Sequence, residues 1–284
     1  MMENANVINN RERLPSDLQQ VMTVAKYDVL KHLRSKRLLG LLVLEGLLLA
    51  LTFGLPIALG ADAAEDPTDY ISGFIGWVDI LIVLGATMFA GDAIVSEFQS
   101  RTGYLLFPNP VKRSTIFVGK YLSTLGIIVL MLVVYYGIAA LLTFAMTGGG
   151  TVLAAYSMLF AFVYGAAAAA LGFLISSIFK GSTGSLILTF FTLLMILPLI
   201  AQLLPIGEIK PWFMLTFCGG VISTILIEPY PTDVMDSIPI GNGEFMNYWS
   251  YYPEVGLSLV VLAVYIVVCL GLGMYLFKRR EMVS

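Results

Sequence analysis

"SEFQSRTGYLLFPNPVKRSTIFVGK" extends from Ser96 to Lys120, and it is polar, basic and interrupted by Pro108 and Pro110. On both sides of it the chain is almost entirely apolar over a length that can cross a bilayer as a helix. Proline stiffens the backbone and does not continue a helix. The stretch is therefore predicted to be a short, stiff connection between two membrane spans, unlike a flexible linker, which would be rich in Gly and Ser.

The composition of the whole chain agrees with a membrane protein. Of its 284 residues, 58% are hydrophobic and 12% are charged, whereas soluble domains carry about 25% charged residues. The mean hydropathy is +0.87. We therefore expect an all-α polytopic membrane protein, since a helix satisfies its own backbone within the bilayer. Six stretches have the length of about 20 residues that a spanning helix needs, namely 38–59, 70–95, 117–146, 152–179, 184–204 and 255–277.

The distribution of charge predicts the orientation. Lys and Arg gather on the cytoplasmic side of membrane proteins. If both termini are cytosolic, every Lys and Arg except Lys210 lies in or beside a cytosolic segment, and the outer loops are acidic. Residues 1–37 would then form a cytosolic segment, and residues 38–284 would form one six-helix membrane domain.

A seventh apolar stretch, residues 212–227, is too short to be a clear span, and Gly219 and Gly220 divide it. A span here would place the basic C-terminal residues outside, against the charge pattern. We expect a re-entrant pair of half-helices that enters from the outer face between the fifth and sixth spans. A loosely attached interfacial helix is the alternative.

An amphipathic helix is predicted at about residues 16–37, before the first span. Ser16 can cap its N-terminus. Apolar residues recur in it at helical spacing, and Lys26, Lys31 and Arg34 make its C-terminal part basic. Such a helix can lie along the inner membrane surface. His32 is the one histidine of the chain, and we expect it to be solvated or to face lipid headgroups.

Little in the sequence indicates catalysis. A single histidine outside the membrane excludes Ser-His and His-based zinc sites, so no catalytic or metal-binding residue is predicted. The GxxxxGK[ST] phosphate loop is absent as well. Glu45, Asp79 and Asp92 lie within the predicted spans, where acids are candidates for a translocation path. Asp79 and Asp92 share one helix on different faces and cannot form a dyad, whereas Glu45 and Asp92 could meet or line a cavity open to the inside. A structural role for the three acids is the alternative.

The loop between the second and third spans carries a recognisable motif. An acidic residue ends the second span, a Leu pair and a Pro-x-x-Arg element follow, and Gly119-Lys120 begin the next helix. The residues in question are Glu97, Arg101, Thr102, Gly103, Leu105, Leu106, Pro108, Pro110, Arg113, Ile116, Gly119 and Lys120. This pattern resembles the signature of type-2 ATP-binding cassette (ABC) exporter permeases, although the order Thr102-Gly103 reverses the usual Gly-Thr. The six spans, the N-terminal helix and the divided outer segment extend the resemblance over most of the chain.

The resemblance implies a permease subunit without enzymatic activity of its own. Two such subunits, alike or different, would assemble in a prokaryotic cell membrane with two separate ATPase subunits that bind ATP and Mg²⁺. Glu97, Arg101, Thr102, Gly103, Pro108, Pro110, Arg113 and Lys120 would then belong to the segment that couples to the ATPase. The helix that carries Lys26, Lys31 and Arg34 would be the connecting helix beside it. No cofactor of this chain and no nucleic-acid partner is expected.

Two other functions fit the residues alone. The chain could be a secondary transporter driven by an ion gradient through its intramembrane carboxylates. It could also be a membrane assembly component that transports nothing.

Overall fold

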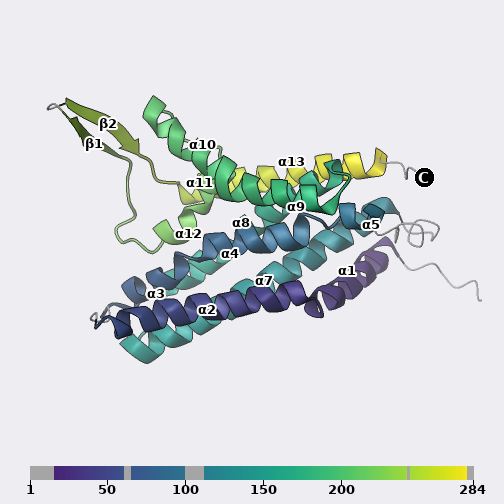
Figure 1. The fold of residues 1–284 in the computed structure, drawn as a ribbon, viewed down its shortest axis with the longest axis horizontal. Coiled ribbons are helices and arrows are strands. Elements are labelled where there is room, and N and C mark those ends of the chain that lie inside the picture. The colour runs from purple at the N-terminus through teal and green to yellow at the C-terminus, as the bar shows by residue number, and fades with distance from the viewer. Residues whose placement is uncertain (1–15, 61–64, 100–111, 242–243, 280–284) are drawn as a thin grey trace, which may run out of the picture.

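The computed structural model describes residues 16–60, 65–99, 112–241 and 244–279. Within these ranges six helical segments are long and apolar enough to cross a membrane, as the hydropathy pattern predicts. They form one elongated bundle (Figure 1) and comprise Lys36–Ala58, Pro67–Gln99, Arg113–Thr147, Val152–Ile178, Ser182–Gly207 and Val255–Arg279. Their ends lie within about one helical turn of the predicted ones.

The two ends of the bundle differ (Figure 1). One end carries helix α1 (Asp17–Leu33), helix α5 (Val95–Gln99) and the last described residues of the chain, and is called the α1 end below. The opposite end carries a β-hairpin and is called the hairpin end. The first and the last described residues therefore lie at the same end, as expected for an even number of spans.

Helix α1 begins as the sequence predicts. The Ser16 hydroxyl accepts a hydrogen bond from the Gln19 N–H at 3.3 Å, and the Gln19 side chain accepts one from the Ser16 N–H at 3.0 Å. This reciprocal capping box satisfies two backbone donors that a helix start leaves unpaired. Helix α1 packs along α7 (Arg113–Thr147), the third span, and is followed by α2 (Lys36–Ala58), the first span.

The centre of the bundle is the fourth span, α8 (Val152–Ile178), which packs against α7 and the sixth span, α13 (Val255–Arg279). Its run Ala167–Ala170 is fully buried. A Cβ atom on Gly172 would lie 2.8 Å from the Cβ of Ala90 in the second span, so only glycine permits this approach.

The outer helices expose far more of their surface. In the apolar 18-residue stretch of the second span 78% of the residues are buried, whereas the corresponding shares in the first, fifth and sixth spans are 22%, 11% and 22%. Their outward residues are apolar, as in a helix surrounded by lipid or by another membrane helix.

The second and fifth spans are irregular helices. The second consists of α3 (Pro67–Ile75), α4 (Val78–Gly85), a π-helical turn η1 (Ala86–Ala90) and, after turns at residues 91–94, α5. The fifth consists of α9 (Ser182–Phe191), a π-helical turn η2 (Thr192–Ile196), α10 (Leu197–Leu203) and a 3₁₀ turn η3 (Leu204–Gly207). In the fifth span, Pro198 explains the π-helical turn, since its ring cannot fit a regular helix.

The segment after the fifth span forms two short helices, α11 (Leu215–Gly219) and α12 (Val221–Thr224), which divide at Gly219 and Gly220 as expected. Their inner residues pack on α8, and α11 also packs on α13. Whether this pair enters the membrane remains a prediction.

The expectation of an all-α chain is wrong at one place. Strands β1 (Val234–Gly241) and β2 (Glu244–Ser250) form an antiparallel hairpin that projects beyond the helices (Figure 1). Its two strands flank the Asn242-Gly243 dipeptide, which is a strong hairpin signal.

Candidate functional site

An ionic cluster at the α1 end joins three separate elements. The Lys120 ammonium group of α7 lies 2.7 Å from Glu97 Oε1 of α5 and 3.3 Å from Asp28 Oδ1 of α1. The three side chains are only 6%, 11% and 10% exposed. Glu97 and Lys120 were singled out from the sequence, and the structure shows that they contact each other. Because one buried cation holds two carboxylates, α1, the end of the second span and the start of the third are tied together at this point.

Asp28 is the member of the cluster that the sequence analysis missed. Burial would raise the pKa of its carboxyl, but the hydrogen bond with His32 and the charge of Lys120 outweigh burial and hold the pKa below its usual range. The signal was an acid at Asp28 on the helix face that also carries Val21, Val24 and Ala25. An acid on the packed face of an amphipathic helix indicates a buried partner.

His32 is not solvated, which corrects the expectation from the sequence. Its side chain is 14% exposed, and its Nε2 lies 3.2 Å from Asp28 Oδ2, one helical turn away. The ring also meets Phe89 of the second span edge-on, at a centroid distance of 5.1 Å. His32 thus positions Asp28 and fills space between α1 and the second span.

Gly119 explains how α1 comes so close to α7. A Cβ atom at this position would lie 2.8 Å from the Cβ of Val24 and 3.0 Å from the carbonyl oxygen of Val21. A residue with a side chain would therefore push α1 outward. Gly119 directly precedes Lys120, so the close approach and the ionic cluster lie at the same level.

The turns at residues 91–94 are stabilised by side chains from other spans. The Ser176 hydroxyl of α8 accepts hydrogen bonds from the Ile94 and Val95 N–H groups at 3.0 and 3.1 Å. The Ser185 hydroxyl of α9 donates to the carbonyl oxygen of Gly91. Lipid offers no hydrogen-bond partners, so an interruption within a membrane span is stabilised by side chains of this kind. The break lies just before α5 and therefore sets the position of Glu97.

A polar cavity of about 260 Å³ lies beside the cluster. It is lined by the cluster residues Asp28 and Lys120 and also by Asp92 and Arg37. Arg37 Nη1 lies 2.8 Å from Asp92 Oδ2 and donates a second hydrogen bond to the Met88 carbonyl oxygen at 3.1 Å. Asp92 is therefore one half of an ion pair between the first and second spans.

The remaining motif residues are described only in part. The Arg113 guanidinium donates to the carbonyl oxygen of Lys278 at 3.0 Å and so joins the third span to the end of the sixth. The preceding Lys112 pairs with Asp17 of α1 at 2.6 Å on the surface. The other predicted coupling residues lie outside the described residues, namely Arg101, Thr102, Gly103, Pro108 and Pro110.

The three basic residues predicted on α1 differ in their surroundings. Lys31 Nζ lies 4.0 Å from Glu97 Oε1, at the edge of the ionic cluster. Lys26 and Arg34 are exposed on the surface of α1 and its C-cap.

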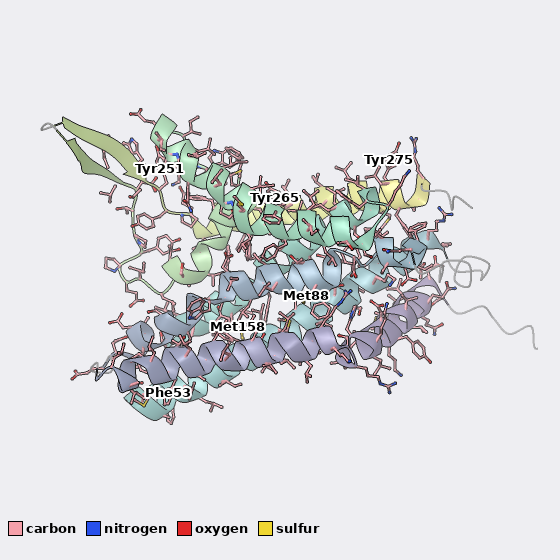
Figure 2. All side chains as sticks on the ribbon, in the orientation of Figure 1. Phe53, Met88, Met158, Tyr251, Tyr265 and Tyr275 are labelled. Atoms are coloured by element: carbon pink, nitrogen blue, oxygen red, sulfur yellow. The ribbon has the colours of Figure 1, made fainter. Side chains whose placement is uncertain are left out.

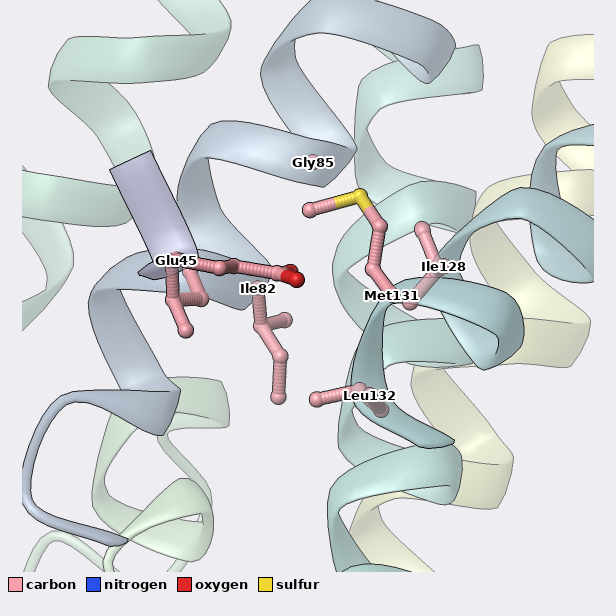
Figure 3. Close-up of a pocket in the computed structure, with 7 residues that line it drawn as sticks. Glu45, Ile82, Gly85, Ile128, Met131 and Leu132 are labelled. Carbon is pink, nitrogen blue, oxygen red and sulfur yellow. The ribbon is translucent and has the colours of Figure 1, made fainter. Parts of the chain in front are cut away.

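The three intramembrane acids line different cavities. Glu45 is 2% exposed and faces an apolar space too narrow for a water molecule, beside Ile82 and Met131 (Figure 3). Among the described residues, neither carboxyl oxygen of Glu45 has a hydrogen-bond partner. Asp92 lines the polar cavity at the α1 end, and Asp79 lines a groove toward the hairpin end. The structure therefore does not bring Glu45 and Asp92 together.

Comparison with known families identifies a match over most of the chain. Residues 20–275 match the family model described as ABC-2 family transporter protein. No curated protein matches the chain. The match covers the first five spans, the sixth as far as residue 275, the ionic cluster, and α1 from its second turn onward. The chain therefore belongs to the ABC-2 family of transporter proteins, as a multi-pass membrane permease.

Proposed function

We propose that this chain is the permease subunit of an ATP-driven exporter in a prokaryotic cell membrane. It works with a second permease subunit and with separate ATPase subunits, which bind ATP and Mg²⁺. The α1 end faces the cytosol, in agreement with its basic residues. The ATPase contacts the segment between the second and third spans and the exposed side of α1.

The observation that carries this proposal is the buried cluster of Asp28, Glu97 and Lys120. It joins α1 to both helices that flank the connection 100–111. A partner that moves either α1 or this connection therefore moves the bases of the second and third spans together, because breaking a buried ion pair is costly. The hydrogen bond from Arg113 to the Lys278 carbonyl oxygen connects the end of the sixth span to the start of the third.

The test uses the chain purified with the ATPase encoded beside it, in lipid nanodiscs. The double variant Lys26→Glu and Arg34→Glu changes only exposed residues of α1. We expect it to retain the thermal stability of the wild type while ATPase association weakens and the permease no longer stimulates ATP hydrolysis. Glu97→Gln should retain association and lose stimulation, because it acts on transmission within the permease.

Glu65→Lys is the matched control, since it alters charge at an exposed position of the hairpin end. It should leave association and stimulation unchanged. Normal stimulation of the ATPase by both the α1 double variant and Glu97→Gln would refute the proposed coupling surface.

A second function, ion-coupled transport by the chain alone, has one observation in its favour. Glu45 is buried in a membrane span, and neither of its carboxyl oxygens has a hydrogen-bond partner in the described part of the chain; such acids often carry protons. Proteoliposomes that contain only this chain would then accumulate substrate when a proton gradient is imposed, and Glu45→Gln would abolish the accumulation. Absence of gradient-driven uptake by the wild-type chain would exclude this function.

A further inference from the structure

A groove of about 490 Å³ opens toward the hairpin end of the bundle. Its walls come from the second and fifth spans, from α11 and α12, and from the end of β2 with the chain that follows it. An adjoining cavity of about 200 Å³ shares Asp79, Thr216 and Ser223 with it. The volume lies in the range of pockets that bind small organic molecules, about 300–1,000 Å³.

Asp79 is the acid of this groove. It lies in the second span, the most buried of the six, and yet its side chain is exposed because the groove reaches it. The buried hydroxyl of Tyr164 interacts with it from α8. The Thr216 hydroxyl, which lines both cavities, is buried and has no hydrogen-bond partner among the described residues. A carboxylate and an unused hydroxyl therefore face the same space.

Among the described residues, no basic side chain lines the groove. Lys210 is the one Lys or Arg between the fifth and sixth spans, and it is already paired with Asp233 at 2.8 Å and with Glu254 at 3.3 Å. Its ammonium group therefore does not neutralise Asp79. The electrostatic potential of the groove is set by the carboxylate and favours a cation.

Aromatic side chains form the outer wall of the groove. The rings of Trp249 and Tyr251 stack at a centroid distance of 5.7 Å and an interplanar angle of 4°, and Tyr252 follows them. Figure 2 shows Tyr251 beside the base of the hairpin. The Tyr251 hydroxyl donates to the Glu208 carbonyl oxygen at 3.0 Å, and the Tyr252 N–H donates to Asp233 at 2.8 Å. These bonds hold the aromatic wall in place before a ligand arrives.

We infer that this groove binds organic cations, that is, compounds with one positive charge and apolar or aromatic substituents. Asp79 neutralises the charge, and Trp249 and Tyr251 offer ring faces that attract a cation and apolar groups. Organic cations are thereby the substrate class of the proposed exporter. That these cations are transported rests on the proposed function, whereas their binding needs no ATPase.

Tetraphenylphosphonium is a suitable probe because tetraphenylborate has the same shape and the opposite charge. Equilibrium binding of both to the purified full chain in nanodiscs separates recognition of charge from partition into lipid. We expect saturable binding of the cation only. Asp79→Asn should weaken it about tenfold or more, and Trp249→Ala about threefold to tenfold. Asp69→Asn is the matched control, since Asp69 is an exposed acid in the same span outside the groove, and it should bind like the wild type.

Each variant is first checked for wild-type thermal stability, and Trp249→Ala tests the site even if Asp79→Asn does not fold. Equal binding of both probes, or an unchanged affinity in both groove variants, would refute the site. ATPase association is measured on the same samples. Intact cation binding without ATPase association would refute the proposed function but not the binding site. ATPase association without cation binding would refute the binding site alone.

Discussion

Removal of Lys120 tests the central claim that one buried cation holds the α1 end together. Lys120→Met leaves the carboxylates of Asp28 and Glu97 without their main partner in a site where both are about 10% exposed. Breaking a buried pair from one side costs about 3–5 kcal/mol. Asp28 keeps His32, and Glu97 keeps Lys31 at 4.0 Å, so we expect the lower limit, about 3 kcal/mol. At about 2–4 °C per kcal/mol this lowers the melting temperature by roughly 6–12 °C.

The chain contains its own reporters for this measurement. Cys218 and Cys269 are free and buried, so a thiol-reactive fluorescent dye labels them as the protein unfolds on heating. Lys112→Met is the matched control because Lys112 also pairs with an acid of α1, at 2.6 Å, but both partners are more than 60% exposed. Such a surface pair contributes about 0.2–1 kcal/mol.

A compensated variant separates lost charge pairing from damaged packing. Lys120→Met combined with Asp28→Asn and Glu97→Gln removes all three charges, and neutral replacement of a buried ionic group is often close to neutral in stability. We expect this triple variant to recover most of the loss. If Lys120→Met melts like Lys112→Met, or if the triple variant is less stable than Lys120→Met alone, the reasoning is refuted.

Three further predictions concern the same end of the bundle. Gly119→Ala should lower the free energy of unfolding by about 1–3 kcal/mol, because its methyl group would lie 2.8 Å from a side chain of α1. The control Gly126→Ala, on the same face of α7, would place its methyl group 3.8 Å from α1 and should leave the melting temperature unchanged. Ser176→Ala leaves two backbone N–H groups of the second span unpaired and should lower the free energy of unfolding by about 2 kcal/mol or more. The control Ser177→Ala removes only a hydrogen bond within α8 and should lower it by less than about 1 kcal/mol. Equal losses of stability in the two variants would contradict the role of Ser176. The lowered pKa of Asp28 contributes stability that is complete above the unfolded pKa of 3.8 and is lost as the pH falls below it. In an acid titration the wild type should therefore be more stable than Asp28→Asn by a constant margin above about pH 4 and lose this margin at lower pH, and parallel curves over the whole range would contradict the pairing.

The sequence was sufficient for the spans because bilayer thickness imposes a length that hydropathy alone reveals. It was sufficient for the α1 cap as well, since Ser16 and Gln19 are local neighbours. It also identified Glu97 and Lys120 as important, through a motif. Their contact could not be predicted, because it depends on how the two helices on either side of the connection 100–111 pack against each other.

The features that were missed depend on contacts between distant residues or on an overlooked local signal. The break at residues 91–94 contains no proline, and the serine that stabilises it lies 82 residues away from Ile94 in the chain. The apolar stripe of α1 was expected to suit the membrane surface, and Leu18 and Met22 of this stripe are 72% and 60% exposed, but the burial of Asp28 against the bundle was not expected. The hairpin was indicated locally by the dipeptide Asn242-Gly243, but no strand was predicted there, because the chain is dominated by apolar helical spans.

The interrupted second span has a mechanical consequence. A continuous helix resists bending along its whole length, but one whose ladder of backbone bonds stops at residues 91–94 bends there first. The part of the second span that ends in Glu97, fixed to Lys120, can therefore bend relative to the part that carries Asp79, so that a displacement at the α1 end becomes a change in angle beside the groove.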